Sequence, residues 1–361
     1  MISHKEVAAI YYYFCGYDWR NILKKSTARK GIYFIILSIV TSGLVLKFTV
    51  TEETIEAVKL INYNYLIIIA GIWLTGLTMD ALTLYFLTKG ANERISLITA
   101  YKVYFIRIFF GLITPFTVGG QPSMIYYMSR NNVPPGKSSS VVLIRFMIVG
   151  TYGLFGAITA FILFYRKLTS IPALNIVFLI AGVLQLVLIT LIGLSILYPQ
   201  ILIKFAIKIG DFLKKIKILK NTYNFRKKII HEAALARSSF KRYFKNHRWY
   251  LIMAIIGSGA RYLSEASLFW IILRMLNIDI CYLDGIMLSV LMFFVLSFLP
   301  TPGGSGIGEV IFVLILSGTI PKHLLGISMI LWRFFYQYIS AMIGAFISAD
   351  HFSPGFKIEK D

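Results

Sequence analysis

Six ionisable side chains lie within long apolar stretches of this sequence, where an isolated charge is costly: Asp80, Arg145, Arg261, Glu265, Glu309 and Arg333. Charged residues in such places pair with one another or face a hydrated cavity, and they mark ligand or ion sites. Arginine offers a planar fork of donors that matches phosphate oxygens, so we predict that Arg145 and Arg333 bind an anion. Glu309 is predicted to hold Arg333 in place or to carry a coupled proton. Structural ion pairs between helices are the alternative at this point.

Two apolar segments are interrupted by proline and glycine, and both carry polar residues at the interruption. They read "GLITPFTVGGQPSMIYYM" from Gly111 and "SFLPTPGGSGIGEVIFVL" from Ser297. A glycine-rich turn followed by a helix start presents backbone amides and a positive dipole end, which suits phosphate. The same residues equally well allow a turn and close packing. The candidate binding residues are Thr114, Gly119, Gly120 and Gln121 in the first segment, and Thr301, Gly303, Gly304 and Glu309 in the second.

The two interrupted segments belong to a longer repeated pattern. An acidic residue (Asp80 or Glu265) comes first, followed by Thr-Pro and then by Gly-Gln or Gly-Glu. An arginine (Arg145 or Arg333) follows 24 residues after that Gln or Glu. Loop charges place the mouth of the first segment inside and that of the second outside. This predicts an inverted repeat, in which broken helices meet near the midplane of the membrane and form a substrate site. Arg261 and Glu265, four residues apart, should share one helix face.

The composition predicts an all-α integral membrane protein. Of the 361 residues, 57% are hydrophobic and the mean hydropathy is +0.73, well above soluble domains. We predict six long transmembrane helices and two re-entrant hairpins at 103–129 and 286–318, whose arms are too short to span comfortably. Arg107 is predicted to lie at the membrane interface, because Lys102 occupies the same segment. The predicted spans are 31–49, 66–88, 141–165, 173–198, 249–276 and 324–347.

The charge distribution predicts orientation and domain organisation. The net charge of +21 reflects basic cytoplasmic loops and not a nucleic-acid partner, and both termini are expected in the cytoplasm at the plasma membrane. The basic segment 199–248 is expected to lie on the membrane surface against anionic phospholipid headgroups, or to serve only as a topology signal.

Cys15 and Cys281 form no metal or disulfide pattern, and no cofactor is expected. The predicted parts are an interfacial segment 1–30, repeats 31–168 and 169–350, and a tail 351–361.

Both interrupted segments resemble motifs of a known family. "TPFTVGGQPSMIYYM" with "VPPGKSSSVVLIRF", and "FLPTPGGSGIGEVIFVL" with "GISMILWRFFYQYI", resemble the flippase-like membrane domain of lysylphosphatidylglycerol synthases. The resemblance covers about residues 30–350 and implies translocation of a lipid, an aminoacylated phosphatidylglycerol in the best-known members. The residues that carry it are Thr114, Pro115, Gly119, Gly120, Gln121 and Arg145, then Pro302, Gly303, Gly304, Gly306, Glu309 and Arg333.

One departure from the synthases bears on function. The chain ends eleven residues after Asp350, which leaves no room for a soluble aminoacyl-transferase domain, so we expect no lysyltransferase activity even if similarity suggests that label. The expected function is therefore a flippase for a phosphate-bearing lipid, polyprenyl-linked lipids included. Alternatives are a membrane subunit that anchors a separate soluble synthase, a lipid-headgroup enzyme, and a small-solute secondary transporter, which fits an inverted repeat equally well.

Overall fold

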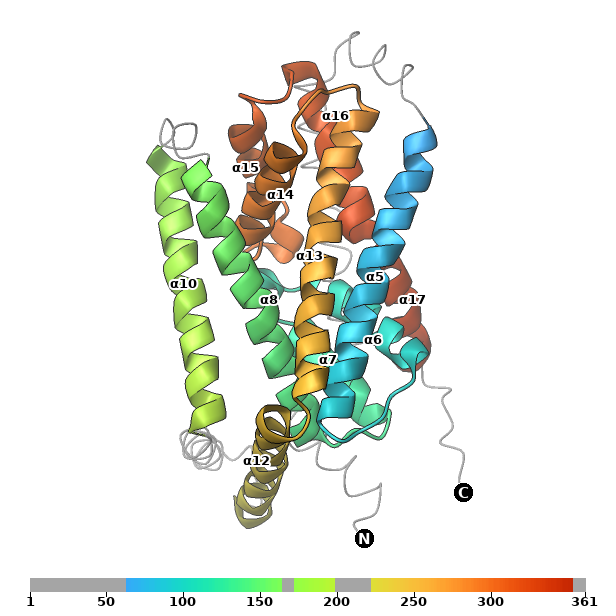
Figure 1. The fold of residues 1–361 in the computed structure, drawn as a ribbon, viewed down its shortest axis with the longest axis vertical. Coiled ribbons are helices and arrows are strands. Elements are labelled where there is room, and N and C mark those ends of the chain that lie inside the picture. Colours follow the sequence, from blue (N-terminus) through green and yellow to red (C-terminus); the bar gives the residue numbers. More distant parts are fainter. Residues whose placement is uncertain (1–62, 164–171, 199–221, 353–361) are drawn as a thin grey trace.

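A computed structural model describes residues 63–163, 172–198 and 222–352, and every regular element in these ranges is helical (Figure 1). The predicted all-α class is confirmed for these residues. The predicted segments 1–30 and 31–49 and most of the tail 351–361 lie outside them. The elements, in chain order, are α5 (Asn64–Gly90), α6 (Leu97–Leu112), η2 (Pro115–Thr117), α7 (Gly120–Arg130), α8 (Pro135–Leu163), α10 (Pro172–Leu197), α12 (Thr222–Lys245), α13 (Arg248–Met275), α14 (Tyr282–Leu296), η3 (Pro302–Gly304), α15 (Ile307–Leu316), α16 (Lys322–Arg333), η4 (Phe334–Tyr338) and α17 (Ile339–Phe352).

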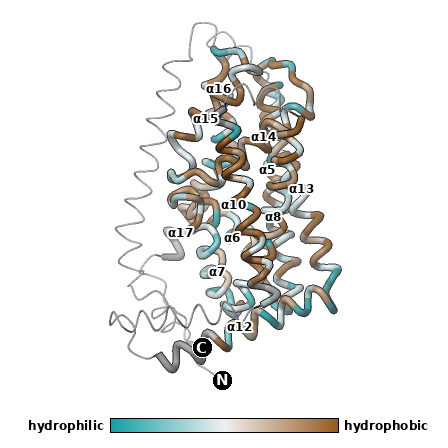
Figure 2. The backbone as a smooth tube through the Cα atoms, turned by 90° about the vertical axis from the view of Figure 1, so that its left-hand side faces the viewer, coloured by the Kyte–Doolittle hydropathy of each residue, from teal (hydrophilic) through white to brown (hydrophobic). Residues whose placement is uncertain are grey.

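Four helical stretches are long and apolar enough to cross a membrane: Asn64–Gly90, Pro135–Leu163, Asn175–Leu194 and Lys322–Ala349. They match four of the six predicted spans. The predicted span 249–276 is also one helix, α13, with 28 residues. It is not among the apolar four, and it carries Arg261, Glu265 and Arg274. Hydrophobic residues run along most of the long helices (Figure 2), as a bilayer environment requires.

The two interrupted segments each form a pair of short helices joined at a break. In the first pair α6 has 16 residues and α7 has 11, and in the second α14 has 15 and α15 has 10. The first pair lies in the lower half of the bundle and the second in the upper half, and the breaks η2 and η3 pack against each other between them (Figure 1). The predicted interruptions are therefore confirmed, and the structure brings them together.

Local stereochemistry explains why the chain breaks at these positions. Pro115 and Pro302 begin the two 3₁₀ turns, where a missing N–H interrupts no helical hydrogen bond. In the second turn Gly303, Gly304 and Gly306 have φ of 60°, 69° and 86°, a region that glycine adopts without a steric penalty. In the first turn Phe116 adopts φ of 54°, which is uncommon for a residue with a side chain. Each break is thus encoded locally.

Helix α12 lies at the lower end of the bundle (Figure 1) and is tied to the ends of two spans. The backbone N–H of Gly136, at the start of α8, donates to Glu232 Oε2 at 2.6 Å. The Tyr243 hydroxyl donates to the Leu87 carbonyl of α5. Burial raises the pKa of Tyr243, so this group remains a neutral donor. The described part of the basic segment 199–248 therefore packs on the bundle, and α12 is not among the described helices that are long and apolar enough to cross a membrane.

Tight helix packing generates a first prediction. A Cβ added at Gly344 of α17 would lie 2.2 Å from the Phe105 carbonyl oxygen of α6, whereas a Cβ at Gly71 of α5 would meet nothing within 4 Å. Overpacking against backbone costs about 1–3 kcal/mol. We expect Gly344→Ala to lower the melting temperature of the protein in detergent, and Gly71→Ala to leave it unchanged or slightly raised. Equal melting temperatures for the two variants would contradict this packing.

Candidate functional site

A chain of four buried charges joins three helices in the middle of the bundle. Arg145 of α8 donates from Nη2 to Asp80 Oδ1 of α5. Arg261 of α13 places its Nε 3.3 Å from the same Asp80 oxygen and donates from Nη1 to Glu265 Oε1 at 2.6 Å. The side chains are between 3% and 11% exposed. We call these four residues the core charge cluster.

The geometry of this cluster follows from helix periodicity and from close helix packing. Arg261 and Glu265 are one turn apart and share a face, as predicted. Helices α5 and α13 form the most extensive helix pair of the described chain, and a Cβ at Gly76 of α5 would already be in van der Waals contact with Ser264 of α13. The pairing of Asp80 with Arg145, 65 residues apart, was not predicted, because nothing in the sequence brings α5 and α8 together.

A second buried pair holds the other broken helix pair. Arg333 Nη1 lies 2.9 Å from Glu309 Oε1, and both side chains are 1% exposed. Arg333 Nη2 also donates to the Gly304 carbonyl of η3 at 3.2 Å. A Cβ at Gly308 would lie 2.5 Å from that nitrogen, so a larger residue there would force the guanidinium to shift. The predicted pairing of Glu309 with Arg333 is confirmed, and it fixes the break to α16.

These ion pairs change the interpretation of the two arginines that we predicted to bind an anion. Arg145 is engaged by Asp80, and Arg333 by Glu309 and Gly304. A buried ion pair neutralises both partners, and breaking it is strongly unfavourable. The structure therefore places both arginines in helix-joining ion pairs.

The polar residues of the breaks fall into two groups. The Thr114 hydroxyl donates to the Phe110 carbonyl at 2.7 Å and accepts the Gly119 N–H at 2.9 Å, so it stabilises the turn. The Cβ positions of Gly119 and Gly120 would clash with the backbone of α6, which gives both a packing role. By contrast, Gln121 Oε1 and Thr301 Oγ1 are buried with no hydrogen-bond partner. These two atoms are available to a ligand.

Arg107 of α6 was not predicted to belong to the site, yet it lies close to the core charge cluster. Its Nε and Nη2 are buried without a hydrogen-bond partner, and its guanidinium lies 5.2 Å from the centre of the Tyr104 ring. It interacts electrostatically with Asp80 and Glu265 of the core charge cluster. The available signal was its spacing: Arg107 follows Lys102 by five residues, a rise of about 7.5 Å along a helix, so the two cations need not share one environment.

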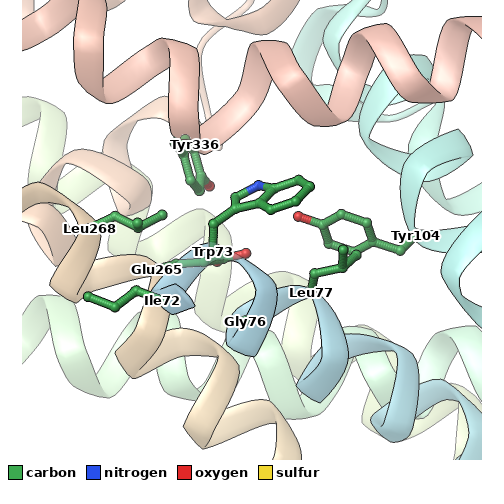
Figure 3. A pocket seen from close by; sticks show the side chains of 8 residues that line it. All are labelled: Ile72, Trp73, Gly76, Leu77, Tyr104, Glu265, Leu268 and Tyr336. Atoms are coloured by element: carbon green, nitrogen blue, oxygen red, sulfur yellow. The ribbon is translucent and has the colours of Figure 1, made fainter. Parts of the chain in front are cut away.

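A small cavity adjoins the core charge cluster. Its volume is about 10 Å³, about the space that one water molecule needs. Trp73 of α5, Tyr104 of α6, Glu265 of α13 and Tyr336 of η4 converge on it (Figure 3). The Trp73 indole N–H is buried without a partner. Tyr336 comes from a π-helical turn directly after Arg333, and such turns often occur at functional sites. In the described ranges no three His, Cys, Asp or Glu side chains gather as metal ligands would.

The helices, their lipid-compatible surface and the buried charges define a multi-pass α-helical membrane protein. Residues 35–344 match the family model described as the lysylphosphatidylglycerol synthase TM region, so the chain belongs to this family, as its motifs predicted. The match is to the membrane region of these synthases. A UPF0104 membrane protein of Archaeoglobus fulgidus is 23% identical over 86% of this chain and 94% of its own length. Another, from Methanocaldococcus jannaschii, is 26% identical over 68% and 73%.

The Glu309–Arg333 pair allows a test of its structural role. Removing one partner leaves a buried charge unpaired, at a cost of about 3–5 kcal/mol. We expect Arg333→Gln to lower the melting temperature strongly, and Glu309→Gln with Arg333→Gln to recover part of the loss. Arg274 and Asp279 form a matched pair at the surface, with side chains 38% and 92% exposed, so Arg274→Gln should have no measurable effect. Additive losses in the double variant would show that the two residues do not interact.

Proposed function

We propose that this protein moves a phosphate-bearing lipid, such as an aminoacylated phosphatidylglycerol, between the leaflets of the plasma membrane. The observation that carries the proposal is the meeting of two opposed, interrupted helix pairs. The Phe116 N–H of the first break donates to the Leu299 carbonyl beside the second break at 3.2 Å. Transporters place substrate sites at such meetings of broken helices. Membership of the synthase membrane-region family supports a lipid as substrate.

In this proposal the two helix pairs are re-entrant hairpins that enter from opposite sides of the membrane. Their arms of 10 to 16 residues are shorter than the ~20 that a span needs. Non-helical backbone at membrane depth is tolerated where protein buries it or where it lines a hydrated cavity. Because η2 and η3 cover each other, each hairpin supplies the protein environment that the other needs. Opposite orientation makes the two halves an inverted repeat.

The cavity of about 10 Å³ beside the core charge cluster is too small for a lipid headgroup, and in this proposal the described conformation is a closed one. Transport would require the two hairpin tips to separate and admit a headgroup while the acyl chains stay in the bilayer. The Glu309–Arg333 pair and the core charge cluster anchor the helices on either side of the tips. The Glu309–Arg333 pair holds the second hairpin to α16, whereas the core charge cluster joins α5 and α8 of the first half to α13 of the second and so links the halves beside the tips.

Proteoliposomes that contain a fluorescent phosphatidylglycerol test this function. Wild-type protein should make the inner-leaflet probe accessible to a membrane-impermeant quencher. Asp80→Asn and Glu309→Gln should lower the transport rate by about tenfold or more, because each leaves a buried arginine unpaired and destabilises the folded arrangement of the helices around the hairpins by about 3–5 kcal/mol. Arg274→Gln, at the surface, is the matched control. Wild-type rates in both buried variants, or co-purification with a soluble synthase without lipid movement, would contradict the proposal.

The proposed orientation is tested by labelling single cysteines with an impermeant maleimide in a Cys15→Ser, Cys281→Ser background. Arg94 and Asp279 are exposed, in loops that follow α5 and α13. Arg94→Cys should be labelled only from the cytoplasmic side and Asp279→Cys only from outside. Labelling of both cysteines from the same side would contradict the proposal that the two hairpins have opposite orientations.

A further inference from the structure

The buried charges near the cavity do not balance. Two carboxylates, Asp80 and Glu265, face three guanidinium groups, those of Arg107, Arg145 and Arg261. Asp80 is shared by Arg145 and Arg261, and Glu265 by Arg261. One positive charge remains, and it belongs to Arg107, which makes no ion pair with the described residues. An excess charge among buried groups is costly, so a bound anion near Arg107 would stabilise the cluster.

The immediate surroundings of Arg107 leave its donors available. Its Nε and Nη2 are buried and make no hydrogen bond. The face of the Tyr104 ring supports the guanidinium at 5.2 Å, a favourable cation–π arrangement that uses none of its N–H groups. A Cβ at Gly120 would lie 3.2 Å from Arg107 Cγ, so the first break packs directly on this side chain. The arginine is held in place, with its hydrogen-bonding capacity unused.

Arg107 lies where the two halves meet. Helix α6, which carries it, packs against both η2 and η3. Tyr104, one turn earlier on the same helix, lines the cavity with Glu265 and Tyr336 (Figure 3). Gln121, whose Oε1 is also unpartnered, follows Gly120. A headgroup admitted between the hairpin tips would therefore meet Arg107, whereas Arg145 and Arg333 are occupied by carboxylates.

We propose that Arg107 is the anion-binding group of the site and that it takes a phosphate with a single negative charge, as in a phosphodiester. Arginine binds phosphate oxygens through two parallel N–H donors, and one negative charge would neutralise the cluster. A phosphomonoester or a pyrophosphate would bring further negative charge, and the described arginines of the core charge cluster are already engaged by carboxylates. That the phosphodiester comes from a lipid headgroup rests on the function proposed above; a soluble phosphodiester has the same chemistry.

Binding can be measured without transport. Full-length protein in neutral detergent is depleted of lipid, and its melting temperature is followed during titration with phosphatidylglycerol, phosphatidic acid, diacylglycerol or soluble glycerophosphoglycerol. Ligands that bind the folded state raise this temperature. For wild type we expect phosphatidylglycerol to act at lower concentration than phosphatidic acid, and diacylglycerol to have no effect. A shift with glycerophosphoglycerol would show that the headgroup suffices, and a shift with the lipid alone would show that the acyl chains contribute; both support the site.

The variants separate ligand binding from a structural role. Arg107→Gln should weaken the apparent affinity for phosphatidylglycerol by about tenfold or more, because a hydrogen-bonded charge is lost. Arg107→Lys, which keeps the charge but loses the fork, should lie between. Lys102→Gln, an exposed cation on the same helix, should match wild type. Without lipid, Arg107→Gln should melt at or above the wild-type temperature, because it removes an uncompensated buried charge; a structural arginine would give a clear decrease.

Three results would overturn the assignment: wild-type affinity in Arg107→Gln, tighter binding of phosphatidic acid than of phosphatidylglycerol, or a marked loss of stability in lipid-free Arg107→Gln. Each is independent of lipid movement. If Arg107-dependent binding holds while proteoliposomes move no lipid, then the proposed function fails and a phosphodiester-binding site remains. If lipid moves but Arg107→Gln binds normally, the function stands and the anion lies elsewhere.

Discussion

A charge within an apolar bundle must find a partner, and this requirement organises the structure. Asp80 bridges Arg145 and Arg261 and thereby joins α5, α8 and α13. Glu309 and Arg333 tie the second break to α16. In a bilayer, apolar side chains gain little by leaving lipid for protein, so polar contacts and close packing determine which helices associate. The ion pairs therefore specify helix neighbours and the register between them.

The backbone N–H and C=O groups at the two breaks also need partners. A break in a helix frees N–H and C=O groups that lipid cannot satisfy. Here Thr114 closes one turn on itself, the Gly304 carbonyl accepts from Arg333, and the Phe116 N–H donates to Leu299 of the opposite pair. The two breaks stabilise each other, because they pack together and one supplies a hydrogen-bond acceptor to the other.

The charge balance of the core distinguishes structural arginines from a binding one. Arg145 and Arg333 are as deeply buried as the most apolar residues, yet both are neutralised. Arg107 is less buried, but its guanidinium forms no ion pair with the described residues, and its Nε and Nη2 make no hydrogen bond. Burial alone therefore does not identify a ligand-binding residue. A better indicator is a buried polar or charged group that has no hydrogen-bond or ion-pair partner within the protein.

The sequence by itself determined the membrane class, most of the long helices, the positions of both breaks and the family, because hydropathy, proline and glycine act locally and the motifs are contiguous. It also placed Arg261 beside Glu265 and matched Glu309 with Arg333. Only the tertiary structure decided that Asp80 meets Arg145, that the two breaks touch, and that Arg107 is left without a carboxylate. Those outcomes depend on which helices become neighbours, and a charge on one helix carries no local signal of the partner that another helix will bring to it.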